Sequence, residues 1–235
     1  MPTLRFSSVA CAAPSAQSGL SMVELLVGVA IALFIAATGT TLLAGNLREN
    51  RSLLLEARIT QDLRTAADVI ARDLRRAGYW AAATDGMWST PAGAPVANPY
   101  VGFAPGSAAS DAVSFRYSRD AAENNVVDTN EQFGFRLRAG VVEMLLGAGN
   151  WQALTDAGTL TVTTFSVTPT VQEISLQNLC ALPCPSASAT CPPRQQVRSL
   201  ALVLSGRSAT DASVTRSLRS SVRLRNDSVV GACAA

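Results

Sequence analysis

An uncharged run of 23 residues near the N-terminus, Leu25–Leu47, most constrains how this 235-residue chain can fold. As an α-helix, such a run is long enough to cross the ~30 Å hydrocarbon core of a bilayer. A cleaved secretory signal is the alternative, but its apolar region is only ~7–15 residues long, and this run continues into further helical pattern. The run therefore predicts a membrane-spanning helix. Glu24 precedes it directly, and an ionisable group at such a position is costly and indicates a function.

The helical pattern continues beyond the lipid-length stretch. Apolar residues recur at every third or fourth position from Leu47 to Ala77 without an intervening proline, which marks one apolar face. Gly78 follows as a candidate C-cap. The sequence therefore predicts one long helix over residues 20–77, apolar all round in its first half and amphipathic in its second.

Strand patterns follow the helix. An irregular stretch, 79–111, comes first, and its aromatic side chains are expected to pack over the helix or the sheet. Alternating or apolar patterns then predict strands at 113–117, 133–137, 160–167, 197–204 and 217–225. A hairpin turn is expected at Ala139–Gly140, and a bulge at Thr163–Thr164, where the alternation changes phase. One long helix followed by strands predicts an α+β fold with a mostly antiparallel sheet packed on the helix.

The composition excludes much catalytic chemistry. The chain has no His, and its 19 basic residues are all Arg. This removes the commonest general base and metal ligand, and also Schiff-base and P-loop chemistry. With no nucleophile–base pair, phosphate loop or metal-binding pattern in view, we expect no enzyme, no cofactor and no metal. The net charge of +2 is too balanced to predict a nucleic acid partner.

The cysteines predict an oxidising compartment. If the chain is cut before Leu20, Cys11 is lost and four cysteines remain, an even number that suits two disulfides. The four are Cys180, Cys184, Cys191 and Cys233. Three connectivities are open, and we expect Cys233 to tie the C-terminus to the 180–191 loop. Zinc is the competing interpretation, disfavoured because no C-x-x-C pair and no His is present.

Two polar segments have alternative interpretations. Residues 119–131 are rich in the oxygen ligands that suit calcium, but they lack the regular spacing and central Gly of a calcium loop. A solvated hairpin loop is therefore favoured.

Arg219, Arg223 and Arg225 alternate along the last strand and could bind DNA phosphates or an acidic partner. A charged, solvated strand face is the simpler interpretation and is favoured.

The stretch "GLSMVELLVGVAIALFIAATG" resembles the N-terminal motif of type IV prepilins, in which a Gly is followed by a hydrophobic residue and by an acid at the fifth position. Here these residues are Gly19, Leu20 and Glu24. The resemblance implies that a prepilin peptidase cuts between Gly19 and Leu20 and methylates the new amine. It also implies that Glu24 pairs with the N-terminus of a neighbouring subunit, since a charge buried among packed helices needs a partner. An isolated membrane anchor with a snorkelling or protonated Glu24 is the alternative.

Two further segments resemble a particular group within the prepilins. "ARDLRRAGYW" (71–80) and "VTRSLRSSVRLRN" (214–226) are similar to the minor pilins called type IV pilus assembly protein W. The resemblance implies a role in priming or assembling a type IV pilus, whether for motility, adhesion or DNA uptake. The implied partners are other minor pilins, the major pilin and a pilus-tip adhesin. A minor pseudopilin J-like component of type II secretion is the runner-up, and a solitary single-pass membrane sensor or enzyme is the rival from another class.

These inferences give a domain organisation and a location. We expect a leader at 1–19, a transmembrane and pilus-core helix at 20–47, an amphipathic helix at 48–78 and a periplasmic β-rich domain at 79–235. Arginines that follow the span would place that side in the cytoplasm by the positive-inside rule. The cysteines and the prepilin resemblance place it outside, and we follow these two. The expected location is the inner membrane, with a single pass, and then the pilus at the cell surface.

Overall fold

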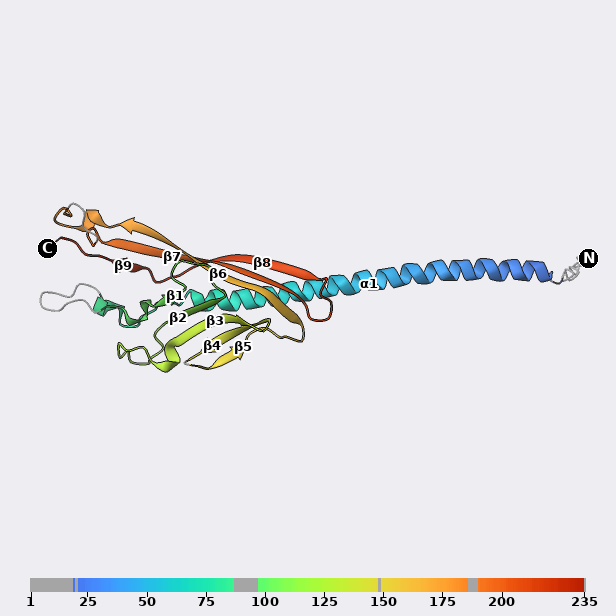
Figure 1. Ribbon diagram of the computed structural model, residues 1–235, viewed down its shortest axis with the longest axis horizontal. Helices are drawn as coiled ribbons and strands as arrows, with labels where there is room; N and C mark the ends of the chain where they lie inside the picture. The colour runs from blue at the N-terminus through green and yellow to red at the C-terminus, as the bar shows by residue number, and fades with distance from the viewer. Residues whose placement is uncertain (1–18, 20, 87–96, 148, 186–189, 235) are drawn as a thin grey trace, which may run out of the picture. The chain divides into compact units, whose positions relative to one another are not determined.

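The computed structural model describes residue 19 and residues 21–86, 97–147, 149–185 and 190–234. Within these residues, one α-helix, α1 (Met22–Leu74), precedes nine β-strands in two antiparallel sheets (Figure 1). The predicted α+β class is confirmed, with two sheets in place of the single sheet expected. The chain divides into two compact units, residues 1–50 and residues 51–235, which are described in turn.

The first unit contains the N-terminal part of α1. Every residue of α1 from Met22 to Asn50 is exposed, and α1 includes a stretch long and apolar enough to cross a membrane by length and composition. The hydroxyl groups of Thr38, Thr40 and Thr41 donate hydrogen bonds of 2.8–3.0 Å to backbone carbonyls three or four residues earlier. These polar groups are therefore satisfied within the helix itself, as a lipid environment requires.

The second unit contains both sheets. The first sheet has the order β1 (Phe103–Ala104), β2 (Ala112–Arg116), β3 (Gln132–Arg138), β4 (Val141–Leu146) and β5 (Trp151–Ala153). The second sheet has the order β6 (Leu160–Ser175), β7 (Arg194–Ser208) and β8 (Thr215–Arg223), and β9 (Ser228–Val230) also pairs with β7. Short 3₁₀ helices lie at Ala83–Gly86, Pro99–Val101, Thr129–Glu131 and Gln177–Leu179.

Turn chemistry sets the register of both sheets. Ala139 and Gly140 have φ of 50° and 79°, the left-handed conformation that a tight two-residue hairpin turn needs, and they join β3 to β4 as expected. The pairing of β6 with β7 shifts register between Val162 and Thr164, which confirms the predicted bulge. The predicted central strand, 197–204, lies within β7 between β6 and β8.

One hydrophobic core joins the second part of α1 to both sheets. The helix contributes its predicted apolar face from Ile59 onward, whereas Leu47 and Leu54 are 56% and 71% exposed. The largest fully buried side chains in the core cluster are Phe115 and Phe135 from the first sheet, Ile59, Leu63, Ile70 and Leu74 from α1, and Leu160, Leu200, Leu202, Leu204 and Leu224 from the second sheet and the residue after it. Each such side chain contributes ~1.5–3 kcal/mol by leaving water.

Distant segments bind the backbone just after α1. The helix ends at Leu74, before Ala77, and Gly78 adopts a φ of 74°, the conformation expected of a residue that closes a helix. The carbonyls of this segment accept five hydrogen bonds of 2.9–3.5 Å from distant residues: Arg75 from the Arg225 amide, Arg76 and Ala77 from Asn226 Nδ2, Gly78 from Asn98 Nδ2 and Tyr79 from the Ser118 amide. The end of the helix is thereby fixed to both sheets.

Candidate processing and assembly site

Glu24 lies in the first turn of α1 and is exposed. Its Oε2 accepts a hydrogen bond of 3.4 Å from the backbone amide of Ser21, the residue before the helix. Ser21 and Glu24 have the S-x-x-E spacing of a capping box, in which the acid satisfies an amide that the helix leaves unpaired. This local role was not predicted, although the S-x-x-E spacing can be read in the sequence. At 3.4 Å the bond is long, so the cap is weak.

Gly19 precedes the helix and is exposed. A Cβ at this position would meet no atom within 4 Å, so packing in the described part of the chain does not require a glycine there. Leu20 and residues 1–18, which include Cys11 and most of the expected leader, lie outside the described residues. A requirement for glycine at position 19 would therefore come from a partner that handles this segment.

Three glycines inside α1 also have open space where a side chain would lie. A Cβ at Gly28, Gly39 or Gly45 would meet nothing within 4 Å, yet a glycine inside a helix costs ~0.5–1 kcal/mol relative to alanine. Small residues of this kind allow another helix to approach closely in a membrane. This part of α1 is therefore suited to contact helices of other chains.

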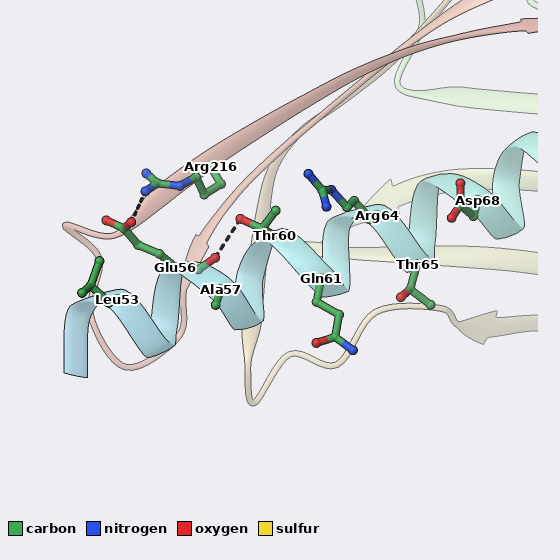
Figure 2. Close-up of a pocket in the computed structure, with 9 residues that line it drawn as sticks. All are labelled: Leu53, Glu56, Ala57, Thr60, Gln61, Arg64, Thr65, Asp68 and Arg216. Atoms are coloured by element: carbon green, nitrogen blue, oxygen red, sulfur yellow. Dashed lines mark hydrogen bonds and ion pairs between the residues drawn. The ribbon is translucent and has the colours of Figure 1, made fainter. Parts of the chain in front are cut away.

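An open groove of about 670 Å³ runs beside the second part of α1 (Figure 2). It is lined by Leu53, Glu56, Ala57, Thr60, Gln61, Arg64, Thr65 and Asp68 from α1 and by Arg216 from β8. Glu56 forms an ion pair with Arg216, which joins the helix to the start of β8. The groove is open, and charged, polar and apolar side chains line it together, unlike the enclosed and mostly apolar pockets that bind small ligands.

The acidic loop that follows β2 folds around a buried tyrosine. Tyr100 is fully buried, and its hydroxyl lies 2.9 Å from Glu123 Oε1 and 3.0 Å from Glu131 Oε2. Burial, followed by the hydrogen bonds to these two carboxylates, raises the pKa of Tyr100 above its usual value. Glu131 is also fully buried and accepts further bonds from the backbone amides of Arg119 and Asp128. These contacts hold the loop against the first sheet.

Three carboxylates in this loop lie close enough to hold a metal ion. The ligand oxygens of Asp120, Asp128 and Glu131 lie within 4.8 Å of one another. Donors from the protein already occupy both oxygens of Glu131, and exposed acidic groups often gather without an ion. The arrangement has a structural role in the loop and does not by itself identify a calcium site.

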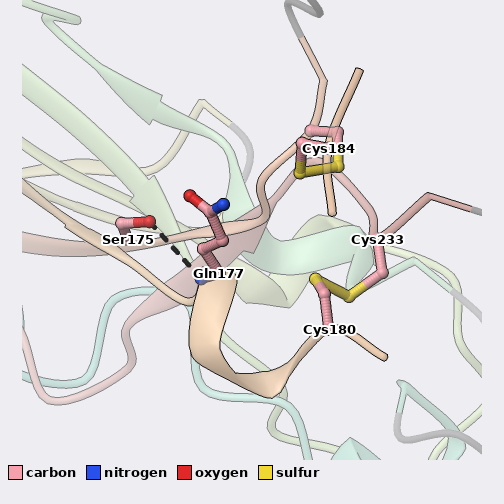
Figure 3. The surroundings of a disulfide bond; sticks show 6 residues. Ser175, Gln177, Cys180, Cys184 and Cys233 are labelled. Carbon is pink, nitrogen blue, oxygen red and sulfur yellow. Dashed lines mark hydrogen bonds between the residues drawn. A yellow bond between two sulfur atoms is a disulfide. The ribbon is translucent and has the colours of Figure 1, made fainter. Parts of the chain in front are cut away.

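Four cysteines form two disulfides at the end of the second sheet. Cys180 is bonded to Cys233, and Cys184 to Cys191 (Figure 3). The first bridge joins the C-terminal segment to the 180–191 loop, and the second closes that loop on itself. This pairing is one of the three connectivities that the sequence left open, and it uses the thiols that a zinc site would need.

Comparison with known proteins identifies one family. The sequence model of the family described as Prepilin peptidase-dependent protein B matches residues 52–224, which include the second part of α1 and strands β1–β8. No curated protein and no solved structure matches the chain.

Proposed function

The chain belongs to the prepilin peptidase-dependent protein B family, and on this basis we propose that it is a minor pilin that primes or assembles a type IV pilus. The observation that carries the proposal is the prepilin-like motif at the start of α1, with Gly19 before the helix and Glu24 in its first turn. The family match spans residues 52–224, so Gly19, Leu20 and Glu24 lie outside it. The motif and the family match are therefore separate lines of support for one non-enzymatic role.

The first proposed step is cleavage of the precursor. A prepilin peptidase cuts between Gly19 and Leu20 and methylates the new amine of Leu20. Gly19 is exposed and precedes the helix, which is consistent with access by a peptidase. The precursor then stays in the inner membrane through the apolar stretch of α1, with residues 51–235 in the periplasm, an oxidising compartment that suits two disulfides.

Assembly follows from the exposed helix. The apolar side chains from Met22 to Leu47 pack against the corresponding helices of other minor pilins and of the major pilin as the subunit leaves the bilayer. Glu24 pairs with the N-terminal amine of a neighbour, since an unpaired charge among packed helices costs several kcal/mol. A pilus-tip adhesin is a further candidate partner. The placement among the minor pilins called type IV pilus assembly protein W is supported by the resemblance of residues 71–80 and 214–226.

Substitution of Glu24 tests the proposal in a piliated strain that lacks the native copy. Glu24→Ala is expected to spare membrane insertion and cleavage, so that N-terminal mass spectrometry still finds a methylated Leu20. It is expected to lower pilus number and the amount of this protein recovered from sheared pili. Glu24→Asp should give an intermediate result because the charge remains while the reach shortens. Glu24→Gln separates charge from hydrogen bonding at nearly equal shape.

Two control variants separate assembly from helix capping and from general charge. Glu24→Gln keeps a side-chain oxygen that can accept the hydrogen bond from the Ser21 amide, so a loss of assembly in this variant would not be due to loss of the cap. Glu49→Ala removes an exposed acid from the same helix outside the apolar stretch and should assemble normally. A Glu24→Ala strain with normal pili that contain normal amounts of the protein would overturn the assembly role. An intact leader in a strain with active peptidase would overturn the prepilin assignment itself.

A further inference from the structure

The outward face of the second sheet has an unusual composition. The inward-pointing residues of its strands pack in the core, so the alternate residues of 164–170, 199–207 and 215–223 point away from it. Of these fourteen residues, nine are Ser or Thr, three are Arg, and the other two are Ala201 and Val203. The face therefore carries short hydroxyl side chains and arginines, with no carboxylate and no aromatic ring at these positions.

The arginines of this face lie along one line. Arg219 and Arg223 are four residues apart on β8, and Arg207 is paired with Thr215, four residues before Arg219. At ~3.3 Å per residue, four residues along a strand span ~13 Å, so the backbone positions that carry these arginines are ~13 Å apart along the strand direction. Arg225 continues the line beyond β8, and its amide binds the carbonyl of Arg75 at 3.3 Å. We call these five residues, Arg207, Arg219, Arg223, Arg225 and Arg75, the arginine stripe.

The arginine stripe carries a net positive charge on an accessible surface. All five arginines are exposed, and Arg75, Arg223 and Arg225 line a groove of about 430 Å³. Arg223 forms an ion pair of 3.2 Å with Asp227, so the stripe combines five guanidinium groups with one carboxylate. Ser205 and Ser217, between Arg207 and Arg219, are linked by a hydroxyl–hydroxyl bond of 2.9 Å. The surface thus offers a row of cations and hydroxyl groups over ~26 Å between Thr215 and Arg223.

We propose that the arginine stripe binds the phosphodiester backbone of duplex DNA without reading its sequence. Arg, Ser and Thr are side chains that contact phosphates and sugars in protein–DNA complexes. The fourteen outward positions carry no Trp or Tyr, which with Arg are the usual anchors of a protein interface. They also carry no aromatic ring on which the bases of a single strand would stack. A linear polyanion with a regular charge spacing fits it best. The proposal is independent of the role in pilus assembly.

Few features of the sequence alone predict this partner. The net charge of +2 is nearly balanced, and only Arg219, Arg223 and Arg225 follow one another in a readable pattern. Arg207 and Arg75 join them through strand pairing and through the contact at the end of α1. The local density of positive charge, which governs DNA binding, therefore appears only in the folded chain.

Fluorescence anisotropy with the full-length protein in a non-ionic detergent tests the proposal. The probe is a labelled 20-base-pair duplex, titrated at several NaCl concentrations. We expect log K to fall linearly with log[NaCl], and two unrelated duplex sequences to bind within twofold of each other. The triple variant Arg207→Gln/Arg219→Gln/Arg225→Gln should weaken binding at least tenfold and lower the slope by about 2.7, at ~0.9 for each lost phosphate contact.

A matched triple variant separates the stripe from bulk charge. Arg58→Gln/Arg64→Gln/Arg138→Gln removes three exposed arginines from α1 and β3 and should bind within twofold of the wild type. The triple variant Arg207→Lys/Arg219→Lys/Arg225→Lys should keep most of the affinity for duplex DNA, because phosphate binding needs the positive charge. The proposal is overturned if the wild type does not bind DNA, or if both Gln variants weaken binding equally. It is also overturned if alginate displaces the duplex at a lower charge concentration than unlabelled DNA does, which would assign the stripe to an acidic polysaccharide.

Discussion

At the scale of single residues, the buried contact between Tyr100 and two carboxylates gives a direct test. Tyr100→Phe removes the hydroxyl group that lies within 3.0 Å of both Glu123 and Glu131. Because Glu131 is fully buried, losing this partner is expected to lower the free energy of unfolding by ~1–3 kcal/mol. Urea unfolding followed by circular dichroism measures the change. Tyr79→Phe is the control, since Tyr79 is 48% exposed, and an equal effect of the two variants would contradict this role for Tyr100.

At the scale of elements, the two disulfides are expected to differ in their contribution to stability. Cys180–Cys233 joins residues 53 apart, and Cys184–Cys191 joins residues only 7 apart. Because a longer loop loses more entropy in the unfolded chain, the first bridge should contribute ~4 kcal/mol and the second ~2 kcal/mol. Double Cys→Ser variants of each pair, compared by guanidinium unfolding, test this order. A larger loss of unfolding free energy in Cys184→Ser/Cys191→Ser would contradict this order. It would mean that native contacts around the 180–191 loop outweigh the loop entropy.

Several elements of the fold could be predicted from the sequence. The strands at 113–117 and 133–137, the Ala139–Gly140 turn and the bulge near Thr163 were all predicted, because burial on one face imposes a period of two and turns need particular residues. The extension of β6 to Ser175 was not predicted, since its last residues are exposed on both faces and carry no pattern. The division into two sheets depends on contacts between distant segments, which one sequence does not encode locally.

The candidate site residues also divide into those predictable from local spacing and those brought together by tertiary contacts. Gly19, Glu24 and the cysteines were found from local spacing. The partners of Tyr100 lie 23 and 31 residues away, and the Glu56–Arg216 pair joins a helix to a distant strand. Contacts of this kind arise from tertiary packing and leave no short-range signal in the chain.

At the scale of the whole molecule, residues 51–235 should fold without the first unit. Among the described residues, all the buried hydrophobic side chains lie at Ile59 or later. A fragment 51–235 secreted to an oxidising compartment is therefore expected to be soluble and to unfold in one cooperative transition. A fragment that begins at Ala66 lacks Ile59 and Leu63 and should lose ~3–6 kcal/mol. Thermal unfolding by circular dichroism compares the two, and aggregation of the longer fragment would show that it needs residues 1–50.

The Cys180–Cys233 bridge makes the C-terminal quarter of the chain a closed covalent ring. Strands β7, β8 and β9 all lie between its two cysteines. A protease that nicks a single peptide bond in this ring, for example in the turn between β7 and β8, leaves both ends attached to the rest of the molecule. The strands that carry most of the arginine stripe would therefore be retained after a cut that, in an open chain, would release the C-terminal fragment.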